Sequence, residues 1–260
     1  MLLSTRDGSV RSSAPVGKDL VAITLSDNGS TAFLADSKPG DVYAVGVPDL
    51  DQRWRRHLGA APFGMLVHKG LLFVTLYDGA AIVVLDPASG RILDTVPTQD
   101  RPAALAVDGM GNVVAATGAG FGIALASGRL WTTDYERSAL VRLPDGFRVD
   151  MPLRLHPFWL AAASDGRLLI SAEGDDEDRD PGAVFSYDPM SSTFTTLARA
   201  RDPDEVIESD GAIYVAAHGD HEVLSIRDGH AEAWAKGAGA VALAPDPKLG
   251  LLAVVVNAHE

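Results

Sequence analysis

Short apolar segments separated by turn residues recur along most of the chain, and the stretch Leu71–Val96 shows their spacing clearly. Leu71–Leu76 and Ala80–Leu85 are rich in Val, Ile and Leu, and the intervening Tyr77-Asp78-Gly79 is typical of a β-hairpin turn. After a second turn, Arg91–Val96 alternates apolar with polar residues, as a half-exposed strand does. The stretch therefore predicts three consecutive short strands.

The same pattern repeats along the chain: an apolar strand, a turn, a second apolar strand, a loop, a third strand and a more polar fourth strand. Complete rounds are expected at residues 20–58 and 62–100, and later rounds open at Pro102, Pro157, Pro203 and Val241. The openings lie roughly 40 residues apart, which is the period of a β-propeller with four strands in each blade. We therefore predict an all-β fold, a six-bladed β-propeller that forms one domain over residues 1–260.

Strands from both ends of the chain complete the last blade in this prediction. The round that opens at Val241 has only two strands, Val241–Ala244 and Leu251–Val256. Two further short strands are expected at Met1–Thr5 and Val10–Ser13, ahead of the first complete round. A sheet made from these four strands would remove the open edges of the fold.

Residues 102–128 leave the number of blades open between six and seven. The round that opens at Pro102 is overlong, because Phe121–Gly128 looks like a second first strand. Strands at Arg129–Thr133 and Ser138–Leu143 follow it. Either blade three carries an inserted strand or hairpin, or residues 102–120 are the remnant of a seventh blade. We favour six blades.

Charge and composition then limit the kinds of partner and chemistry that the protein is expected to have. The formal net charge is −13, and nucleic-acid binding needs Lys and Arg to neutralise phosphates, so no nucleic-acid partner is expected. The cluster Arg53-Trp54-Arg55-Arg56 is interpreted as a solvated outer strand. The absence of cysteine excludes disulfides and thiolate chemistry. The N-terminal segment lacks the apolar run of a signal peptide, and no stretch is long enough to span a bilayer, so we expect a cytoplasmic protein with no membrane partner.

The segments Ala81–Ile92 and Arg101–Gly109 resemble the repeats of YVTN and NHL-type β-propeller proteins. The resemblance covers nearly the whole chain and extends to the broader superfamily with gluconolactonase-like lactonases and streptogramin lyases. It implies the propeller fold. Gluconolactonase-like enzymes hold a divalent metal ion with Glu, Asn and Asp side chains. Their Asn-Gly and Asp-Gly ligand motifs are not found at matching positions, because Pro144-Asp145-Gly146 falls in an outer turn.

The loops before first strands and after second strands are expected to meet at one end of the blades, because the strands of a blade alternate in direction. Propellers can bind small ligands there. Four of the seven histidines, His156, His218, His221 and His259, fall in these loops. Such clustering favours a small-molecule enzyme, a hydrolase, lactonase, lyase or cyclase, over the alternative of a non-catalytic propeller that binds a protein or peptide.

Candidate residues for three roles lie in these loops. Glu173, His218 and His259, with His156 beside them, form a plausible ligand set for a divalent metal ion such as Zn, Mn, Ni or Fe. His156, Glu205 and His221 are candidate catalytic proton carriers. An apolar pocket for a hydrophobic or aromatic small molecule is expected from the aromatic residues Phe63, Tyr77, Tyr135, Phe158 and Trp159.

Each of these assignments has a structural alternative. The histidines can equally be interpreted as polar loop residues around a wet funnel, and Phe158 and Trp159 as side chains packed between blades. No nucleotide cofactor is expected, because the chain has neither a Walker loop nor a dinucleotide fingerprint.

Overall fold

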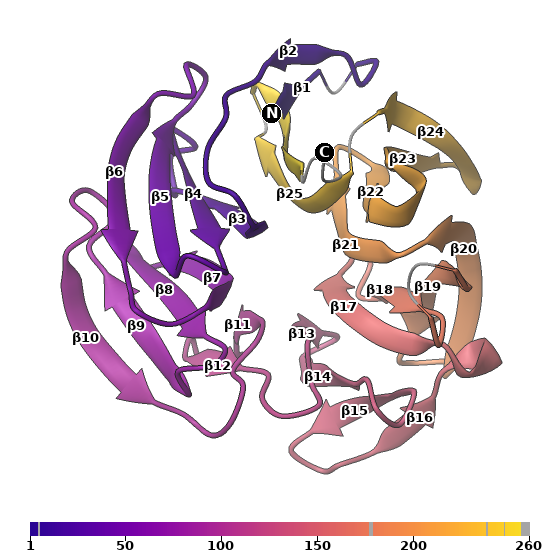
Figure 1. Cartoon of the computed structure of the whole chain (residues 1–260). Coiled ribbons are helices and arrows are strands. Elements are labelled where there is room, and N and C mark those ends of the chain that lie inside the picture. The colour runs from indigo at the N-terminus through magenta and orange to yellow at the C-terminus, as the bar shows by residue number, and fades with distance from the viewer. Residues whose placement is uncertain (5, 177–178, 238, 247, 256–260) are drawn as a thin grey trace. The chain divides into compact units, whose positions relative to one another are not determined.

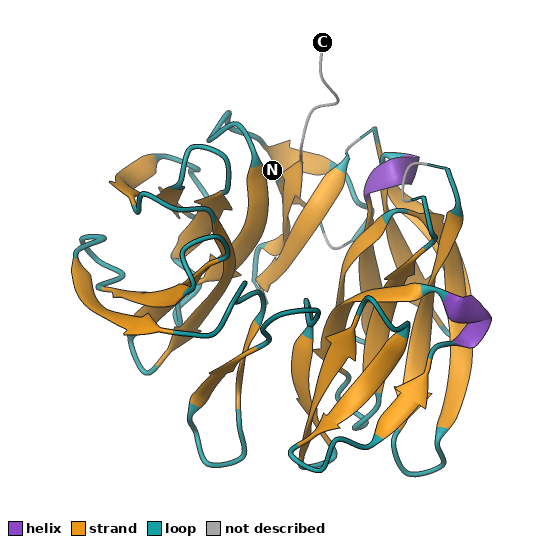
Figure 2. Ribbon diagram, turned by 60° about the horizontal axis from the view of Figure 1, so that its bottom comes forward, coloured by secondary structure: helices purple, strands orange, loops and turns teal. Residues whose placement is uncertain are grey.

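The structure is a computed structural model that describes residues 1–4, 6–176, 179–237, 239–246 and 248–255. In these residues the chain folds almost entirely into antiparallel strands (Figure 2). Two short 3-10 helices, η1 (Pro152–Arg154) and η2 (His218–Asp220), are the only helices in the described ranges. No helix of the described residues is long and apolar enough to cross a membrane.

The strands form six four-stranded antiparallel sheets, the blades of a six-bladed β-propeller, and one separate two-stranded sheet (Figure 1). The predicted fold class is therefore confirmed. Residue contacts divide the chain into two compact units, one with residues 1–104 and the C-terminal segment from Val241, the other with Leu105–Ala240. The expectation of a single domain over residues 1–260 stays a prediction.

The first unit contains three blades. Blade one is formed by β3 (Leu20–Leu25), β4 (Thr31–Asp36), β5 (Asp41–Gly46) and β6 (Gln52–His57). Blade two is formed by β7 (Pro62–His68), β8 (Leu71–Leu76), β9 (Ala81–Leu85) and β10 (Ile92–Pro97). The last blade is formed by β25 (Ala240–Asp246), β26 (Gly250–Val255), β1 (Leu2–Leu3) and β2 (Val10–Ser12).

The last blade joins the two ends of the chain, as predicted. Strand β1 pairs with β26, and Leu2 lies opposite Leu252 in the register. The N-terminal ammonium of Met1 donates a hydrogen bond of 2.9 Å to the carbonyl oxygen of Ala253. The N-terminal residues therefore add two strands to a sheet begun about 240 residues later in the chain.

The second unit contains the other three blades and a hairpin. The hairpin is formed by β11 (Leu105–Val107) and β12 (Val113–Ala115). Blade three is formed by β13 (Ile123–Ala126), β14 (Arg129–Asp134), β15 (Ala139–Leu143) and β16 (Arg148–Asp150). Blade four is formed by β17 (His156–Ala162), β18 (Leu168–Glu173), β19 (Pro181–Asp188) and β20 (Thr193–Arg201). Blade five is formed by β21 (Pro203–Ser209), β22 (Ala212–Ala217), β23 (Glu222–Arg227) and β24 (His230–Lys236).

The expectation that blade three opens at Pro102 is wrong. Strands β11 and β12 pair only with each other in the described part of the chain, and the first strand of blade three begins at Ile123. Residues 105–115 therefore form a separate two-stranded element, and the six complete blades are counted without it. An apolar run such as Pro102–Val107 looks the same in sequence whether or not a full blade follows it.

Burial falls from the inner strands of a blade to its outermost strand. Strands β4 and β5 are buried along their whole length, whereas β10 is exposed throughout. The Arg53–Arg56 cluster lies on the outermost strand β6, as predicted. Two of its side chains also hold the neighbouring blade: the Trp54 indole donates to Pro87 O at 3.0 Å and Arg56 Nε donates to Gly90 O at 2.7 Å. The cluster thus has a structural role in the first unit.

A buried hydroxyl fastens the bulged start of the first strand in blade two. The pairing of β7 with β8 shifts register between Pro62 and Met65, which leaves the Gly64 N–H without a ladder partner. That N–H donates 2.7 Å to Thr75 Oγ1, and Thr75 in turn donates 2.8 Å to Ala103 O. Thr75 is fully buried. A Cβ on Gly64 would lie 2.3 Å from Ala103 O, so this position requires glycine.

Blades three and four repeat this arrangement. The N–H groups of Phe121 and Gly122 donate to Thr133 Oγ1 at 3.0 and 2.9 Å. In blade four the Trp159 N–H donates 3.2 Å to Ser171 Oγ, and Ser171 donates to Asp204 O of blade five. Each hydroxyl stands two residues before the residue that follows or ends the second strand: Tyr77, Tyr135 or Glu173.

We expect Thr75→Val to destabilise the protein by about 1–3 kcal/mol, because it leaves a buried N–H and a buried carbonyl without their partner. Urea denaturation monitored by tryptophan fluorescence would measure the loss. Thr95→Val on the exposed strand β10 is the matched control and should change the midpoint little. Equal midpoints for both variants would contradict the role assigned to the hydroxyl.

Candidate functional site

Within each blade, the start of the first strand lies opposite the end of the second strand. Pro62 pairs with Leu76 in blade two, His156 with Glu173 in blade four, and Pro203 with Ala217 in blade five. The predicted meeting of these two loop types at one end of a blade is therefore confirmed. Chemistry at this end depends on which side chains each blade places there.

In the first unit, blade two places an aromatic pair at this end. The rings of Phe63 and Tyr77 have centroids 5.4 Å apart, at an interplanar angle of 36°. A side-chain hydrogen bond with Tyr77 is the main cause that raises the pKa of Arg101. Two of the predicted substrate-binding residues thus lie together, beside the cationic side chain of Arg101.

In the second unit, an aromatic cluster forms between blades three and four. Phe121 packs edge-on against Tyr135 with centroids 5.4 Å apart, and lies 5.2 Å from Phe158. Tyr135 stacks on the imidazole of His156 at 4.9 Å and 27°. The structure therefore brings together Tyr135, Phe158 and His156 of the predicted site.

His156 is held by hydrogen bonds at both ring nitrogens. Nδ1 donates 2.8 Å to the carbonyl oxygen of Tyr135, and Nε2 lies 3.0 Å from Asp175 Oδ1. Burial lowers the pKa of His156, but the hydrogen bonds to Tyr135 and Asp175 and the negative charges of Asp175 and Glu173 outweigh it, so the pKa lies above its usual value. Two acceptors at two ring nitrogens fit the protonated imidazolium.

Glu173 is the buried carboxylate of the same cluster, with an exposed fraction of only 4%. The Tyr135 hydroxyl donates 2.8 Å to Glu173 Oε2. His156 and Glu173 face each other across neighbouring strands, where side chains are about 5 Å apart at Cβ. A histidine, a buried carboxylate and a phenol therefore share one small region of the second unit.

His218 belongs to a separate group in blade five. Its Nδ1 lies 3.0 Å from Asp202 Oδ2 and 3.9 Å from Asp204 Oδ2. One donor atom from each of the three residues falls within 4.8 Å of the others. Carboxylate and imidazole donors suit Zn, Mn, Fe or Ni, so this donor set fits a divalent ion. His218 thus lies beside two aspartates, whereas Glu173 is hydrogen-bonded to Tyr135. The two predicted metal ligands therefore belong to different groups of side chains.

The remaining predicted residues occupy several environments. Trp159 packs against the core cluster that blades four and five share, which is the structural alternative considered for it. Glu205 lies in the first strand β21 and is partly buried. His221 follows η2 in the left-handed conformation, and its N–H donates 2.9 Å to His218 O. His259 lies outside the described residues.

Four residues of these groups were not predicted as site residues from the sequence: Phe121, Asp175, Asp202 and Asp204. Asp175 follows the second strand β18, Asp202 directly precedes the first strand β21, and Asp204 is the second residue of β21, so their places in the sequence pointed to this end of the blades. Phe121 was missed because the start of blade three was placed at Pro102. The dipeptide Phe63-Gly64 of blade two is repeated as Phe121-Gly122, and that repetition is the signal that locates the true start.

The fold resembles solved β-propellers. A streptogramin B lyase shares 12% identity over 92% of this chain and 91% of its own, with a TM-score of 0.77. Virginiamycin B lyase from Staphylococcus aureus shares 15% over 87% and 88%, with a TM-score of 0.71. The periplasmic gluconolactonase of Pseudomonas aeruginosa shares 14% over 98% and 94%, with a TM-score of 0.69. The resemblance to propellers of these groups is thereby confirmed at the level of fold.

No protein-family model matches the chain, and no curated protein matches its sequence. The chain is thus defined as a six-bladed β-propeller by its sheets and by these likenesses. Its activity has to be argued from the side chains described above.

We expect Asp175→Asn to lower the pKa of His156, because the variant removes a negative charge and a charge-assisted hydrogen bond. Histidine ring NMR signals followed against pH would measure the change, with the exposed His230 as internal reference. A raised folded-state pKa adds stability below about pH 6.5, which is lost as the pH rises through the folded value. This pH dependence should be weaker in the variant. An unchanged His156 titration would contradict the contact.

Proposed function

We propose that the protein is a small-molecule enzyme, a hydrolase or lyase, that cleaves a carbon–oxygen bond by acid–base catalysis. The observation that carries the proposal is the His156, Tyr135 and Glu173 cluster of the second unit. It combines a proton donor and a proton acceptor that differ in environment, which is the usual requirement for acid–base catalysis. Likeness in fold to lyases and a gluconolactonase supports the reaction class.

His156 is the proton donor in this proposal. Its Nδ1 is bound to the Tyr135 carbonyl, which fixes the ring and leaves Nε2 for the substrate. Nε2 contacts Asp175, whose side chain is 87% exposed. Exposed ion pairs are worth only about 0–1 kcal/mol, so a substrate can displace Asp175 at little cost. The Nε2 proton then passes to the leaving oxygen as the carbon–oxygen bond breaks.

Glu173 is the proton acceptor. Burial keeps this carboxylate away from bulk water, and the Tyr135 hydroxyl orients its Oε2. In a hydrolase, Glu173 takes a proton from water as the water oxygen bonds to the carbonyl carbon. In a lyase, it takes the proton from the carbon next to the one that loses oxygen. In both cases one proton is taken up by Glu173 and one is released by His156.

We propose the class of the substrate from the aromatic cluster. Phe121 packs against both Tyr135 and Phe158, and Tyr135 stacks on His156. Small-molecule sites are lined mainly by apolar and aromatic side chains, with a few polar groups that orient the ligand. The substrate in this proposal is an apolar or aromatic lactone or ester.

We further propose that Asp202, Asp204 and His218 hold a divalent metal ion beside this reaction. An ion bound there would supply Lewis-acid polarisation of a carbonyl oxygen. Ser171 of blade four donates to the carbonyl oxygen of Asp204 in β21, which links the proposed ligands to the strand that ends in Glu173. These residues replace the set Glu173, His218 and His259 as the ligands to be tested.

The activity is tested with a panel of aliphatic and aromatic lactones, aryl esters and a streptogramin B antibiotic. We expect turnover of at least one class, and His156→Gln should lower kcat by about 10²–10⁴-fold, the typical contribution of a general acid. Tyr135→Phe should lower kcat less, because the carboxylate remains. His230→Gln on the outer strand β24 should match the wild type.

The same experiment separates the alternative function. A propeller that only binds a protein or peptide would turn over no member of the panel. Turnover that survives His156→Gln unchanged would reject this catalytic site while leaving an enzyme elsewhere in the chain.

Metal binding is tested by calorimetry with Mn²⁺ and Zn²⁺ on metal-free protein that carries no His-tag. We expect one site per chain, weakened by more than about tenfold in Asp204→Asn and in His218→Ala, since each removes a ligand. Asp210→Asn, an exposed acid in the same blade, is the control. The absence of heat with wild-type protein, or equal affinity in all variants, would reject the site.

A further inference from the structure

The first unit contains a hollow of about 660 Å³, and none of the residues of the cluster described above lines it. It is formed by the loops after β4 and before β7, the end of β6, and the loop after β8. Its lining residues are Ser37–Gly40, His57, Gly59–Ala61 and Asp78. The volume is within the range of about 300–1,000 Å³ that small-molecule sites occupy.

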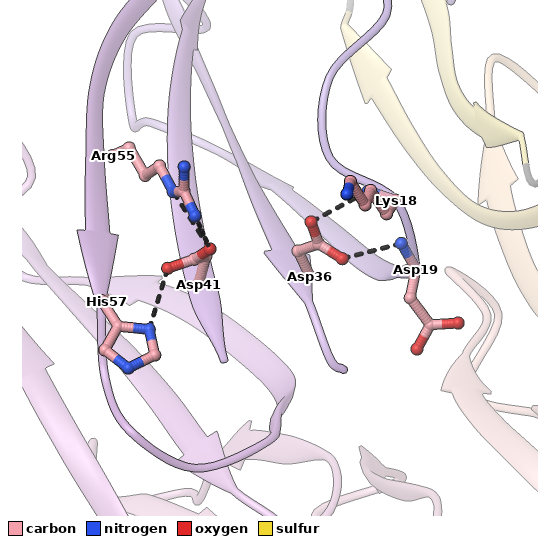
Figure 3. A network of polar contacts seen from close by, with 6 residues as sticks. All are labelled: Lys18, Asp19, Asp36, Asp41, Arg55 and His57. Atoms are coloured by element: carbon pink, nitrogen blue, oxygen red, sulfur yellow. Dashed lines mark hydrogen bonds and ion pairs between the residues drawn. The ribbon is translucent and has the colours of Figure 1, made fainter. Parts of the chain in front are cut away.

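A buried carboxylate orients the histidine of this hollow (Figure 3). Asp41 is fully buried at the start of β5, and its Oδ2 accepts from Arg55 Nε at 3.0 Å and from Arg55 Nη2. Its other oxygen, Oδ1, lies 3.1 Å from His57 Nδ1. Because Asp41 occupies Nδ1, the imidazole presents Nε2 to a ligand. The buried carboxylate is thus satisfied by two side chains that reach the surface.

Small residues keep the hollow open around this ring. A Cβ on Gly40 would lie 3.5 Å from His57 Cε1 and 3.1 Å from Ala60 O. Gly40 also has a positive φ of 72°, which glycine adopts readily. The opposite wall is formed by Gly59, Ala60 and Ala61. None of these side chains is large enough to fill the space.

The charged side chains of the lining differ in sign. Lys38 is 75% exposed and forms an ion pair of 2.9 Å with Asp19, a contact that a ligand can replace at low cost. Lys38 supplies donors for an anion, and so does His57 Nε2 when the ring is protonated, because Nδ1 already donates to Asp41; Asp78 supplies an acceptor. Two donors for an anion and one acceptor for a hydroxyl define the ligand class.

We propose that this hollow binds a small hydroxycarboxylate, with its carboxylate between Lys38 Nζ and His57 Nε2 and its hydroxyl on Asp78. Asp41 and Arg55 position His57 and do not touch the ligand. The site stands on the geometry of blades one and two, so it does not depend on the function proposed for the second unit.

The test is an NMR titration with malate, succinate and inorganic phosphate, following the His57 ring signals in the wild-type protein and the backbone amide signal of Gly40, which lines the hollow, in the wild type and every variant. Malate and succinate differ by one hydroxyl, so malate should bind several-fold more tightly. Lys38→Ala and His57→Gln should each weaken malate binding by about tenfold or more, as expected for loss of a charge-assisted hydrogen bond. Both side chains are largely exposed, at 75% and 68%, so the variants should fold.

Two variants complete the design. Lys69→Ala, an exposed lysine in the same unit, should leave the affinity unchanged. Asp78→Asn should reduce the preference for malate over succinate. The proposal is overturned if none of the three anions shifts the His57 signals at millimolar concentration, if binding survives both Lys38→Ala and His57→Gln, or if phosphate and succinate bind as tightly as malate.

Discussion

Backbone N–H groups at the starts of the first strands are the constraint on which the loop ends depend. A buried N–H without a partner costs free energy comparable to a lost hydrogen bond, so each has to be satisfied. Thr75, Thr133 and Ser171 meet this need in blades two, three and four. Each hydroxyl fixes the second strand two residues before Tyr77, Tyr135 or Glu173. The positions of these three side chains therefore follow from the packing of the blade, and their chemistry can vary without disturbing it.

Blade one solves the same problem with a carboxylate. Asp36 is fully buried and accepts from the N–H groups of Lys18 and Asp19 at 2.9 and 2.7 Å (Figure 3). The position that corresponds to the hydroxyl residues is Ala35, whose side chain cannot accept a hydrogen bond. In blade five the corresponding residue is Ala216, and the loop after its second strand instead binds blade four: Asp220 Oδ2 accepts 2.7 Å from the N–H of Arg201 at the end of β20.

The period of apolar segments was enough to predict the sheets, the count of blades and the blade shared by the two termini, because these depend on burial. It failed at Pro102–Val107, where the same pattern forms a hairpin. The site was predicted less completely. His156, Glu173 and Tyr135 were placed at the correct end of a strand, since strand direction fixes that end. The contacts that these residues make with Asp175 and Phe121 depend on the register of the bulged strand and on which blade lies next. The pattern of apolar positions in one sequence predicts neither of these.

The buried carboxylates at the loop ends differ in the groups that compensate their charge. Asp36, Asp41 and Glu173 all have exposed fractions below 5% and all lie at loop ends. A buried charge has to be compensated by hydrogen bonds or by an opposite charge. The type of compensating group decides whether a proton can be transferred there. Asp36 is compensated by backbone N–H groups, which cannot move a proton. Glu173 has a phenol and a histidine beside it, and Asp41 has an arginine and a histidine. Of these three carboxylates, only Glu173 and Asp41 have an ionisable ring beside them, and the two proposed sites are built on those rings.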